Sequence, residues 1–387
     1  MDERYMDEVA TWAVEDNYPG AVGRSGHRLC CCDSFLYSVG GYNSQHGLLQ
    51  EVWRLNLSTG EWEQVSDSTT TPSVCVSHCL VSSGGHLLML GGTSYPFGNV
   101  LTNEVEACDQ LTGEWQTLHT TGQKPPSLYG QAARRAGEYV YTVGGTSGYH
   151  FSFHAHALHL PTLTWTTLAK PDLCKQDGES PGRYRAEIGV LDGKTVVVVG
   201  GASAFTVFSL DQLPVLDVRS GQWEVQRAHP DPITHAHPAP RRGHAAVQMN
   251  NDLYVIGGTD GMTVYDDVWR LHLPSLTWTR HPLRLPTPLY FHDAALTQNG
   301  ILYVYGGLSS VGSSQRSSAL YRAKLQAQPL LEVAWDAFTL HCPTITSSPA
   351  QYSHINHEYL AAGVPRNLMK RLAKLPKTKY QLNSHEH

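Results

Sequence analysis

The stretch from Asn251 to Trp278 holds the pattern on which the rest of the chain is built. Residues 253–256 form a β-branched and aromatic run that ends at the pair Gly257-Gly258. After a short polar loop, residues 268–273 alternate between apolar and polar side chains, as a half-buried strand does, and a Pro-Ser turn leads to the tryptophan. The stretch therefore predicts two strands. The first ends where glycine supplies backbone angles or close packing that a side chain would block.

The same pattern occurs six times along the chain. In each copy an apolar run ends in a Gly-Gly pair, and the second glycines of the pairs are Gly41, Gly92, Gly145, Gly201, Gly258 and Gly307. Consecutive pairs are separated by 51, 53, 56, 57 and 49 residues. A tryptophan follows the first five pairs after 20 to 23 residues, at Trp62, Trp115, Trp165, Trp223 and Trp278. A period near 50 residues with four strands per unit is typical of a β-propeller.

This pattern resembles the kelch repeat. Six kelch repeats imply an all-β fold, a six-bladed kelch β-propeller, which we assign to residues 9–328. Residues 329–376 are expected to form a small C-terminal unit of three helices, because their apolar residues recur at helical spacing. Residues 377–387 are expected to be a disordered tail.

The sixth repeat is incomplete, because no turn and tryptophan follow the strand predicted at 319–325. The candidate for its missing outer strand lies at the other end of the chain, where residues 10–14 surround Trp12. Pairing this segment with the sixth repeat would close the ring and cover the edge that an open propeller exposes. The alternative is a disordered N-terminal tail in which the tryptophan has no such role.

The composition excludes several classes of protein. The chain has 28 basic and 34 acidic side chains, a net charge of −6, whereas extensive nucleic-acid contact needs a basic stripe. There is no run of about 20 apolar residues to span a membrane, and the acidic start of the chain lacks the apolar core of a signal peptide. Eight cysteines, three of them adjacent at 30–32, suit neither a disulfide framework nor a zinc site. We therefore expect a cytoplasmic and nuclear protein without nucleic-acid or membrane partners.

The helices predicted after Pro329 carry apolar faces that three short helices cannot bury among themselves. Two segments resemble docking motifs of ubiquitin-ligase subunits. The first resembles an elongin-binding box, although that family prefers cysteine where this chain has alanine; the residues implied to bind elongin are Leu330, Leu331, Ala334, Trp335 and Phe338. The second fits the cullin-2 box at each specified position, and the residues implied to bind the cullin are Val364, Pro365, Leu368 and Leu372. The alternative is a helical cap packed on the base of the propeller.

Repeats and boxes together resemble the kelch substrate receptors of cullin-2 RING ubiquitin ligases. The segments RSGHR, GGTSYPFG, LYGQA, RYR, RRGH and PLYFH are similar to strand starts and loops of that group. The resemblance implies binding of protein C-termini that end in small residues such as glycine or alanine. Elongin B/C, cullin-2 and its RING subunit would be partners, and degradation in protein quality control the outcome. It implies neither cofactor nor catalytic residue in this chain, because other subunits transfer the ubiquitin.

One mouth of the central channel is the candidate binding site. In a kelch blade the innermost strand starts, and the second strand ends, on the same face of the disc. Arginine there would offer a planar fork to a carboxylate, and aromatic side chains would exclude water around it. The candidate degron-binding residues at strand starts are Arg24, Tyr129, Arg183, Arg185, Arg241, Arg242 and Tyr290, and those after the glycine pairs are Tyr42, Tyr95, Phe97, Tyr149, Ser203 and Phe205. About half of the five arginines are expected only to make structural hydrogen bonds between blades.

Histidines occur in two kinds of place. His27, His78 and His244 each lie 14 residues before the second glycine of a pair, and repetition at a fixed offset indicates inter-blade hydrogen-bonding groups rather than catalysts. The clusters at 154–159 and 235–237 have alternating histidines that could bind a metal. They also fit one face of a strand and an exposed loop, so no metal site is predicted.

Three classes of function remain, of which a substrate receptor is favoured. Some kelch propellers are copper oxidases, but those are secreted and carry an appended metal-binding domain, neither of which this sequence predicts. A non-degradative kelch scaffold for a signalling or cytoskeletal protein has no need of a cullin-2 box. The residues upstream of the recognised terminus cannot be deduced from the sequence, since they depend on how the loops fold.

Overall fold

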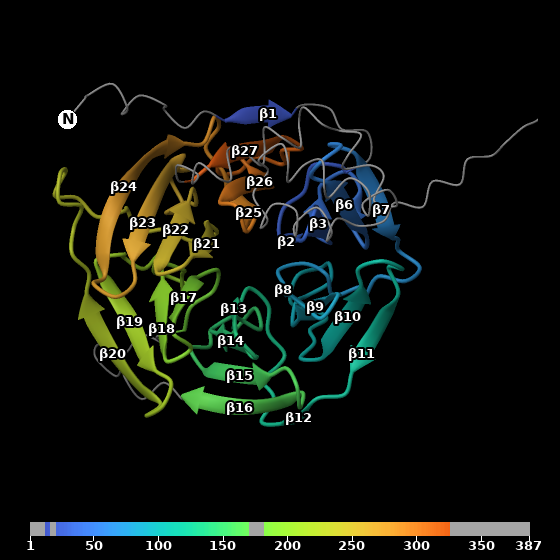
Figure 1. Ribbon diagram of the computed structural model, residues 1–387, viewed down its shortest axis with the longest axis horizontal. Helices are drawn as coiled ribbons and strands as arrows, with labels where there is room; N and C mark the ends of the chain where they lie inside the picture. Colours follow the sequence, from blue (N-terminus) through green and yellow to red (C-terminus); the bar gives the residue numbers. More distant parts are fainter. Residues whose placement is uncertain (1–11, 16–20, 170–181, 326–387) are drawn as a thin grey trace, which may run out of the picture. The chain divides into compact units, whose positions relative to one another are not determined.

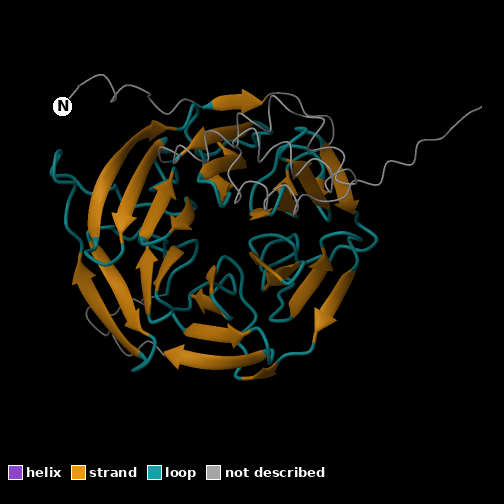
Figure 2. Ribbon diagram, in the orientation of Figure 1, coloured by secondary structure: helices purple, strands orange, loops and turns teal. Residues whose placement is uncertain are grey.

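The computed structural model describes residues 12–15, 21–169 and 182–325. Within these ranges the regular elements are β-strands, arranged as six sheets around a central axis (Figures 1 and 2). This confirms the prediction of an all-β, six-bladed propeller. The predicted helices of 329–376, with the elongin- and cullin-binding residues, and the tail that follows lie outside the described residues.

Each blade has four antiparallel strands that run in order from the axis outward. The innermost strands are β2 (Arg28–Cys32), β8 (Cys79–Ser83), β13 (Ala132–Ala136), β17 (Glu187–Leu191), β21 (Ala245–Met249) and β25 (Tyr290–Leu296). The second strands are β3 (Phe35–Val39), β9 (His86–Leu90), β14 (Tyr139–Val143), β18 (Thr195–Val199), β22 (Asp252–Ile256) and β26 (Ile301–Leu308). The innermost strands contact one another in a closed ring, from β2 through β8, β13, β17 and β21 to β25 and back to β2 (Figure 1).

The outer half of each blade follows the same order. The third strands are β6 (Val52–Asn56), β10 (Val105–Asp109), β15 (Ala155–His159), β19 (Gln212–Asp217), β23 (Asp267–His272) and β27 (Leu320–Lys324). The outermost strands are β7 (Trp62–Ser66), β11 (Trp115–Leu118), β16 (Thr164–Ala169), β20 (Gln222–Arg227), β24 (Thr277–Arg284) and β1 (Ala13–Glu15). Two short additions are a hairpin of β4 (Tyr42–Asn43) and β5 (Gly47–Leu48), and β12 (Thr121–Gly122), which pairs in parallel with β16.

The sixth blade takes its outermost strand from the start of the chain. Strand β1 pairs antiparallel with β27, with Ala13 opposite Arg322. Continuing this register by one residue places Trp12 opposite Ala323, the position at which Trp278 lies opposite Leu271 in the fifth blade. Trp12 packs edge-on against Tyr321 with ring centroids 6.0 Å apart, and its indole N–H donates to the Arg284 carbonyl oxygen. The strand lies slightly later than the predicted range of 10–14, but it fills the predicted place.

Both glycines of all six pairs have positive φ angles, between 58° and 109°. The first pair shows why side chains are excluded. A Cβ atom at Gly40 would lie 2.2 Å from the carbonyl oxygen of Cys75 in the next blade, and the N–H of Gly41 donates to that same oxygen at 2.9 Å. Each pair repeats this hydrogen bond to the following blade, so the Gly-Gly signal marks the junction between blades.

The apolar core is divided into layers between neighbouring blades. One layer joins Val197 and Leu213 of the fourth blade to Leu253 and Trp269 of the fifth. The tryptophan of the outermost strand belongs to such a layer, and in the fifth blade Trp278 is fully buried with its Nε1 donating to the Leu210 carbonyl at 2.8 Å. Within the described ranges no helix is long and apolar enough to cross a membrane.

Candidate functional site

The two sets of loops that the sequence places at one mouth do lie side by side. In the first five blades, the residue three before the innermost strand forms a β-bridge with the residue after the Gly-Gly pair of the same blade. The bridged pairs are Ser25–Tyr42, Val76–Thr93, Tyr129–Thr146, Tyr184–Ala202 and Arg242–Thr259, and Tyr290 pairs with Leu308 in the sixth blade. Most of the predicted residues therefore border one mouth of the channel.

A ring of backbone hydrogen bonds encircles the channel just inside this mouth. Its members, which we call the neck ring, are Gly26, Ser77, Gly130, Arg185, Gly243 and Phe291, one from each blade, all with φ between 55° and 71°. The N–H of each residue donates to the carbonyl oxygen of its neighbour in the preceding blade, over 2.7 to 3.3 Å, until the ring closes from Gly26 back to Phe291. The neck ring therefore fixes the position of every loop at the mouth.

Arg185 extends across the neck ring from the fourth blade. Its Nη2 donates to Ser77 Oγ of the second blade, and its guanidinium carbon lies 5.0 Å from the centroid of the Phe291 ring in the sixth. A Cβ atom at Gly26 in the first blade would lie 3.2 Å from Nη2. One guanidinium thus contacts the second and sixth blades, passes close to Gly26 of the first, and lies across the channel.

Arg242 is the second arginine of the mouth whose guanidinium has spare donors. The side chain is half-buried, and within the described ranges it makes no hydrogen bond or ion pair. Its Nε is buried without a partner, which is costly for a charged donor. Its Nη1 and Nη2 groups have no described partner either and are not buried, so they are the donors that a ligand could reach.

Aromatic side chains form one wall of the mouth over the first and second blades. Tyr42 and Tyr95 are stacked with centroids 5.0 Å apart, and Phe97 meets both rings edge-on at 5.3 and 5.4 Å. The guanidinium of Arg316 covers the Tyr42 ring at 5.0 Å. Further round the mouth, Tyr129 meets Tyr184 edge-on at 5.5 Å. These contacts hold a broad apolar surface in place.

Three of the predicted arginines make structural hydrogen bonds. Arg24, Arg183 and Arg241 are buried, and the Nη1 of each donates to the first glycine carbonyl of its own blade, at Gly40, Gly200 and Gly257. Arg24 also pairs with Glu51 at 2.6 Å, and Arg241 with Asp267 at 2.7 Å. These hydrogen bonds lie within one blade, but the guanidinium groups of Arg24 and Arg183 also face a ring of the preceding blade, Tyr305 at 6.0 Å and Phe153 at 5.7 Å. The carbonyl oxygens of all three arginines accept the Gly-Gly hydrogen bond from the preceding blade.

The other predicted residues lie at the rim. Tyr149 and Phe205 stand out from their loops with 98% and 94% of their surfaces exposed. Ser203 caps its own turn, since its Oγ accepts the Thr206 N–H at 3.2 Å. Tyr290 packs against Phe291 at 5.0 Å between centroids. None of these four approaches Arg185 or Arg242 within the described contacts.

A buried charged network lies among the innermost strands. Arg28 of the first blade pairs with Glu187 of the fourth at 2.9 Å and with Asp293 of the sixth at 3.3 Å. Burial raises the pKa of the Asp293 carboxyl, against the opposing effect of the Arg28 guanidinium. These side chains also border a cavity of about 450 Å³ among the innermost strands. Because its charges are paired internally, the network is unsuited to capturing a further anion.

The repeated histidines are buried beside the neck ring. His27, His78 and His244 lie next to the glycine pairs, and His292 holds the same place in the sixth blade. The His244 ring lies within hydrogen-bonding reach of the Val199 backbone, and the His292 ring within reach of the Ile256 backbone, each in the preceding blade, which agrees with the interpretation of the repeated histidines as inter-blade groups. Burial lowers the pKa of His78, His244 and His292 to about 3, so all three are neutral at pH 7.

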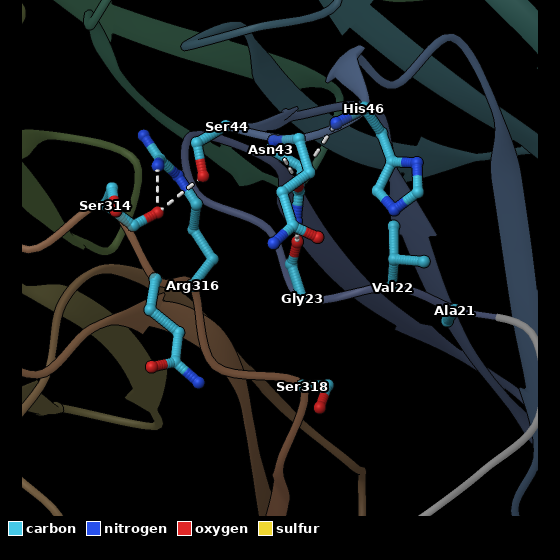
Figure 3. Close-up of a pocket in the computed structure, with 11 residues that line it drawn as sticks. Ala21, Val22, Gly23, Asn43, Ser44, His46, Ser314, Arg316 and Ser318 are labelled. Atoms are coloured by element: carbon cyan, nitrogen blue, oxygen red, sulfur yellow. Dashed lines mark hydrogen bonds between the residues drawn. The ribbon is translucent and has the colours of Figure 1, made fainter.

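A polar pocket of about 700 Å³ adjoins the aromatic wall between the first and sixth blades (Figure 3). The loop after β26 provides Arg316, whose Nε donates to Ser25 Oγ at 3.3 Å and whose Nη1 donates to the Ser314 carbonyl at 2.5 Å. Asn43 Nδ2 closes the opposite side by donating to the Gly23 carbonyl at 2.6 Å. The pocket thus places a third arginine near the mouth.

Four residues of the site were absent from the sequence prediction. Ser77 and Phe291 would have emerged from aligning the six repeats and asking what replaces glycine at the neck position, and Tyr184 is the residue just before that position in the fourth repeat. Arg316 follows the sixth glycine pair, but a Ser-rich loop hides its spacing. Among the described residues no group of three or more histidine, cysteine, aspartate or glutamate side chains is arranged to hold a metal ion.

Comparison with known proteins agrees with this architecture. A family model for the KLHDC2/KLHL20/DRC7 kelch-repeats domain matches residues 8–201 and 172–339. Kelch domain-containing protein 10 of Homo sapiens is 34% identical over 361 residues, covering 90% of this chain and 79% of that protein. The Rattus norvegicus protein is 33% identical, covering 90% and 85%, and the Drosophila melanogaster homolog is 30% identical, covering 92% and 63%. The chain belongs to the kelch-repeat family.

Proposed function

We propose that this chain is the substrate-recognition subunit of a cullin-2 RING ubiquitin ligase, and that its propeller mouth binds protein C-termini ending in glycine or alanine. The observation that carries the proposal is the contrast among the mouth arginines. Arg24, Arg183 and Arg241 are buried, and each donates its Nη1 to a glycine carbonyl, whereas Arg185 and Arg242 keep donors for a guest. An α-carboxylate is the anion that every protein terminus supplies.

The shape of the mouth favours a chain end over an internal segment. Because the Arg185 guanidinium lies across the neck ring, a peptide that enters the channel meets a cation where its chain must stop. A terminal carboxylate satisfies that cation, whereas an internal peptide would leave it desolvated without a counter-charge. Small final residues suit a floor to which an arginine, a serine and a phenylalanine already contribute.

The segments resembling the elongin-binding and cullin-2 boxes support the ligase part of the proposal. The propeller would recognise the substrate, the C-terminal boxes would recruit elongin B/C and cullin-2, and other subunits would transfer ubiquitin. The chain would thus act as an adaptor without catalytic residues of its own. Its place would be protein quality control in the cytoplasm and nucleus.

Titration of one peptide as free acid and as C-terminal amide tests the binding part. A hydrogen bond to a charged group contributes about 1.5–3 kcal/mol, and an unpaired buried charge costs about 2–5 kcal/mol. Amidation should therefore weaken binding about 30-fold to several-thousand-fold. Arg242→Ala should cause a similar loss, and Lys there should restore only part, because a point charge lacks the fork. Arg219→Ala, at an exposed position on the turn between β19 and β20, is the matched control and should bind as wild type does.

Co-purification from cells tests the assembly part. Leu330→Ser should abolish elongin capture, whereas substituting Pro365 and Leu368 together should lose only cullin-2. Both variants should keep the peptide affinity of the wild-type propeller. Wild-type protein that binds both peptide forms equally and captures neither elongin nor cullin-2 would instead indicate a non-degradative kelch scaffold.

A further inference from the structure

All six residues of the neck ring adopt the same backbone conformation, but only three of them are glycines. The first, third and fifth blades supply Gly26, Gly130 and Gly243, whereas the second, fourth and sixth supply Ser77, Arg185 and Phe291. Positive φ is costly for residues with a side chain, about 1–3 kcal/mol each, and persists where the surrounding structure imposes it. Ser77, Arg185 and Phe291 thus each carry the free-energy cost of a positive φ, and all three lie at the proposed binding site.

Packing explains why the alternation is strict. A Cβ atom at Gly130 would lie 2.1 Å from the Tyr184 ring, and one at Gly243 would lie 2.7 Å from the Phe291 ring. The third and fifth blades therefore cannot carry a side chain at this position while their neighbours carry aromatic ones. Only alternate blades contribute groups to the floor of the mouth, and these groups are a hydroxyl, a guanidinium and a phenyl ring.

We propose that Ser77 is a second ligand of the terminal carboxylate, beside Arg185; this inference rests on the proposed function. Ser77 Oγ accepts a hydrogen bond from Arg185 Nη2, and its backbone N–H and carbonyl belong to the neck ring. A hydroxyl has one proton to donate besides its acceptor sites. Within the described ranges nothing receives that proton, so it is available to an incoming oxygen.

The Arg185 side chain supplies the complementary donor. Its Nη2 is committed to Ser77, while Nη1 makes no hydrogen bond in the described structure and is not sealed from solvent. A carboxylate has two oxygens. One would accept from Arg185 and the other from the Ser77 hydroxyl, so that serine and arginine, already bonded to each other, bind the anion as a unit. Phe291 stacks beneath the guanidinium and limits its movement.

Substitution of Ser77 by glycine tests this assignment without endangering the fold. Glycine already holds the equivalent place in three blades and adopts the required φ freely, so Ser77→Gly should leave the melting temperature unchanged or higher. The probe is a labelled decapeptide ending in alanine, with library-selected upstream residues, titrated against the full chain as free acid and as amide. We expect Ser77→Gly to weaken binding of the free acid about 10- to 100-fold and of the amide less than about 3-fold.

Each outcome separates the possibilities. Ser310→Gly, in the exposed loop after β26, removes a hydroxyl away from the neck ring and should bind both peptides as wild type does. If Ser77→Gly retains wild-type affinity for the acid while wild-type protein still distinguishes acid from amide, the Ser77 assignment is wrong and the proposed function stands. Equal losses for acid and amide would mean that Ser77 only orders the neck and touches no carboxylate. Wild-type protein that fails to distinguish the two peptides would refute the proposed function and this assignment together.

Discussion

Arg241 and Arg242 are adjacent in sequence and opposite in role. Arg241 is fully buried and its donors are taken by Ala239, Gly257 and Asp267, whereas Arg242 is half-buried and its side chain has no described partner. The role of Arg241 recurs at Arg24 and Arg183, but no other blade has an arginine at the bridge position that Arg242 occupies. Repetition around the ring therefore identifies residues that build the propeller, and a departure from repetition identifies residues available for binding.

Alanine substitution of Arg241 and of Arg242 should show the largest difference between a framework residue and a binding residue. Arg241→Ala leaves the Asp267 carboxylate buried without its counter-charge, which should cost about 3–5 kcal/mol of unfolding free energy. Arg242→Ala should change that free energy by less than about 0.5 kcal/mol while it lowers peptide affinity. Chemical denaturation of the two variants beside wild type is the measurement. Comparable destabilisation by both would show that Arg242 also belongs to the framework.

Acidification should lower the unfolding free energy of the propeller framework without changing the peptide affinity of the site. In the folded protein burial holds the pKa of His78, His244 and His292 at about 3, below the ordinary value of 6.5 that applies to the unfolded chain. Protons therefore bind only the unfolded chain between these values, so stability is full above pH 6.5 and falls as the pH drops toward 3. Between pH 7.5 and 5.5 these histidines should remove about 4 kcal/mol of unfolding free energy.

Peptide affinity should remain constant over the same range, provided that the protein stays folded. Neither a guanidinium nor a terminal carboxylate titrates between pH 5.5 and 7.5. A variant with His244→Gln supplies the control, because removing one titrating group should flatten the stability profile without touching the site. Affinity that falls in step with stability would mean that a histidine contributes to binding.

The sequence predicts the framework well because the framework repeats. Glycine pairs, late tryptophans and the place of Trp12 all follow from six comparable copies, and each copy checks the others. The site is harder to predict because its side chains are the exceptions. In the sequence, Arg24 and Arg185 are both arginines shortly before a predicted innermost strand, and nothing distinguishes their roles. The hydrogen bonds do: Arg24 donates to Gly40 and Glu51 of its own blade, whereas Arg185 donates to Ser77 across the channel. Ser77 and Phe291 were missed because only alternate repeats have glycine at the neck position, so that the shared backbone conformation is not apparent from any single repeat.

Substitution of Trp12 tests how much the N-terminal strand β1 contributes to the stability of the sixth blade. It completes the sixth blade at the register position that Trp278 holds in the fifth, but it is only partly buried. Trp12→Ala should therefore cost about 2–3 kcal/mol of unfolding free energy, less than the 3–5 kcal/mol typical of a fully buried tryptophan such as Trp278. Thermal unfolding of the two alanine variants gives the ranking. An unchanged melting curve for Trp12→Ala would show that the sixth blade is stable without this closure.

Substitutions in the aromatic rim should have the smallest effects on peptide affinity. Like the arginines, the rim residues include one held by neighbouring side chains and one without such contacts. Phe97 is held edge-on against Tyr42 and Tyr95, so its surface is presented to a peptide at little entropic cost. Phe205 is 94% exposed and has no described ring contact, so a peptide that used it would first have to order it. Phe97→Ala should lower peptide affinity about 2- to 10-fold, the value of an aromatic contact of about 0.5–1.5 kcal/mol, and Phe205→Ala less than about 2-fold. Titration of one free-acid peptide against both variants decides the matter. A larger loss of affinity in Phe205→Ala than in Phe97→Ala would mean that the exposure of a side chain, rather than its prior ordering, determines how much it contributes to binding.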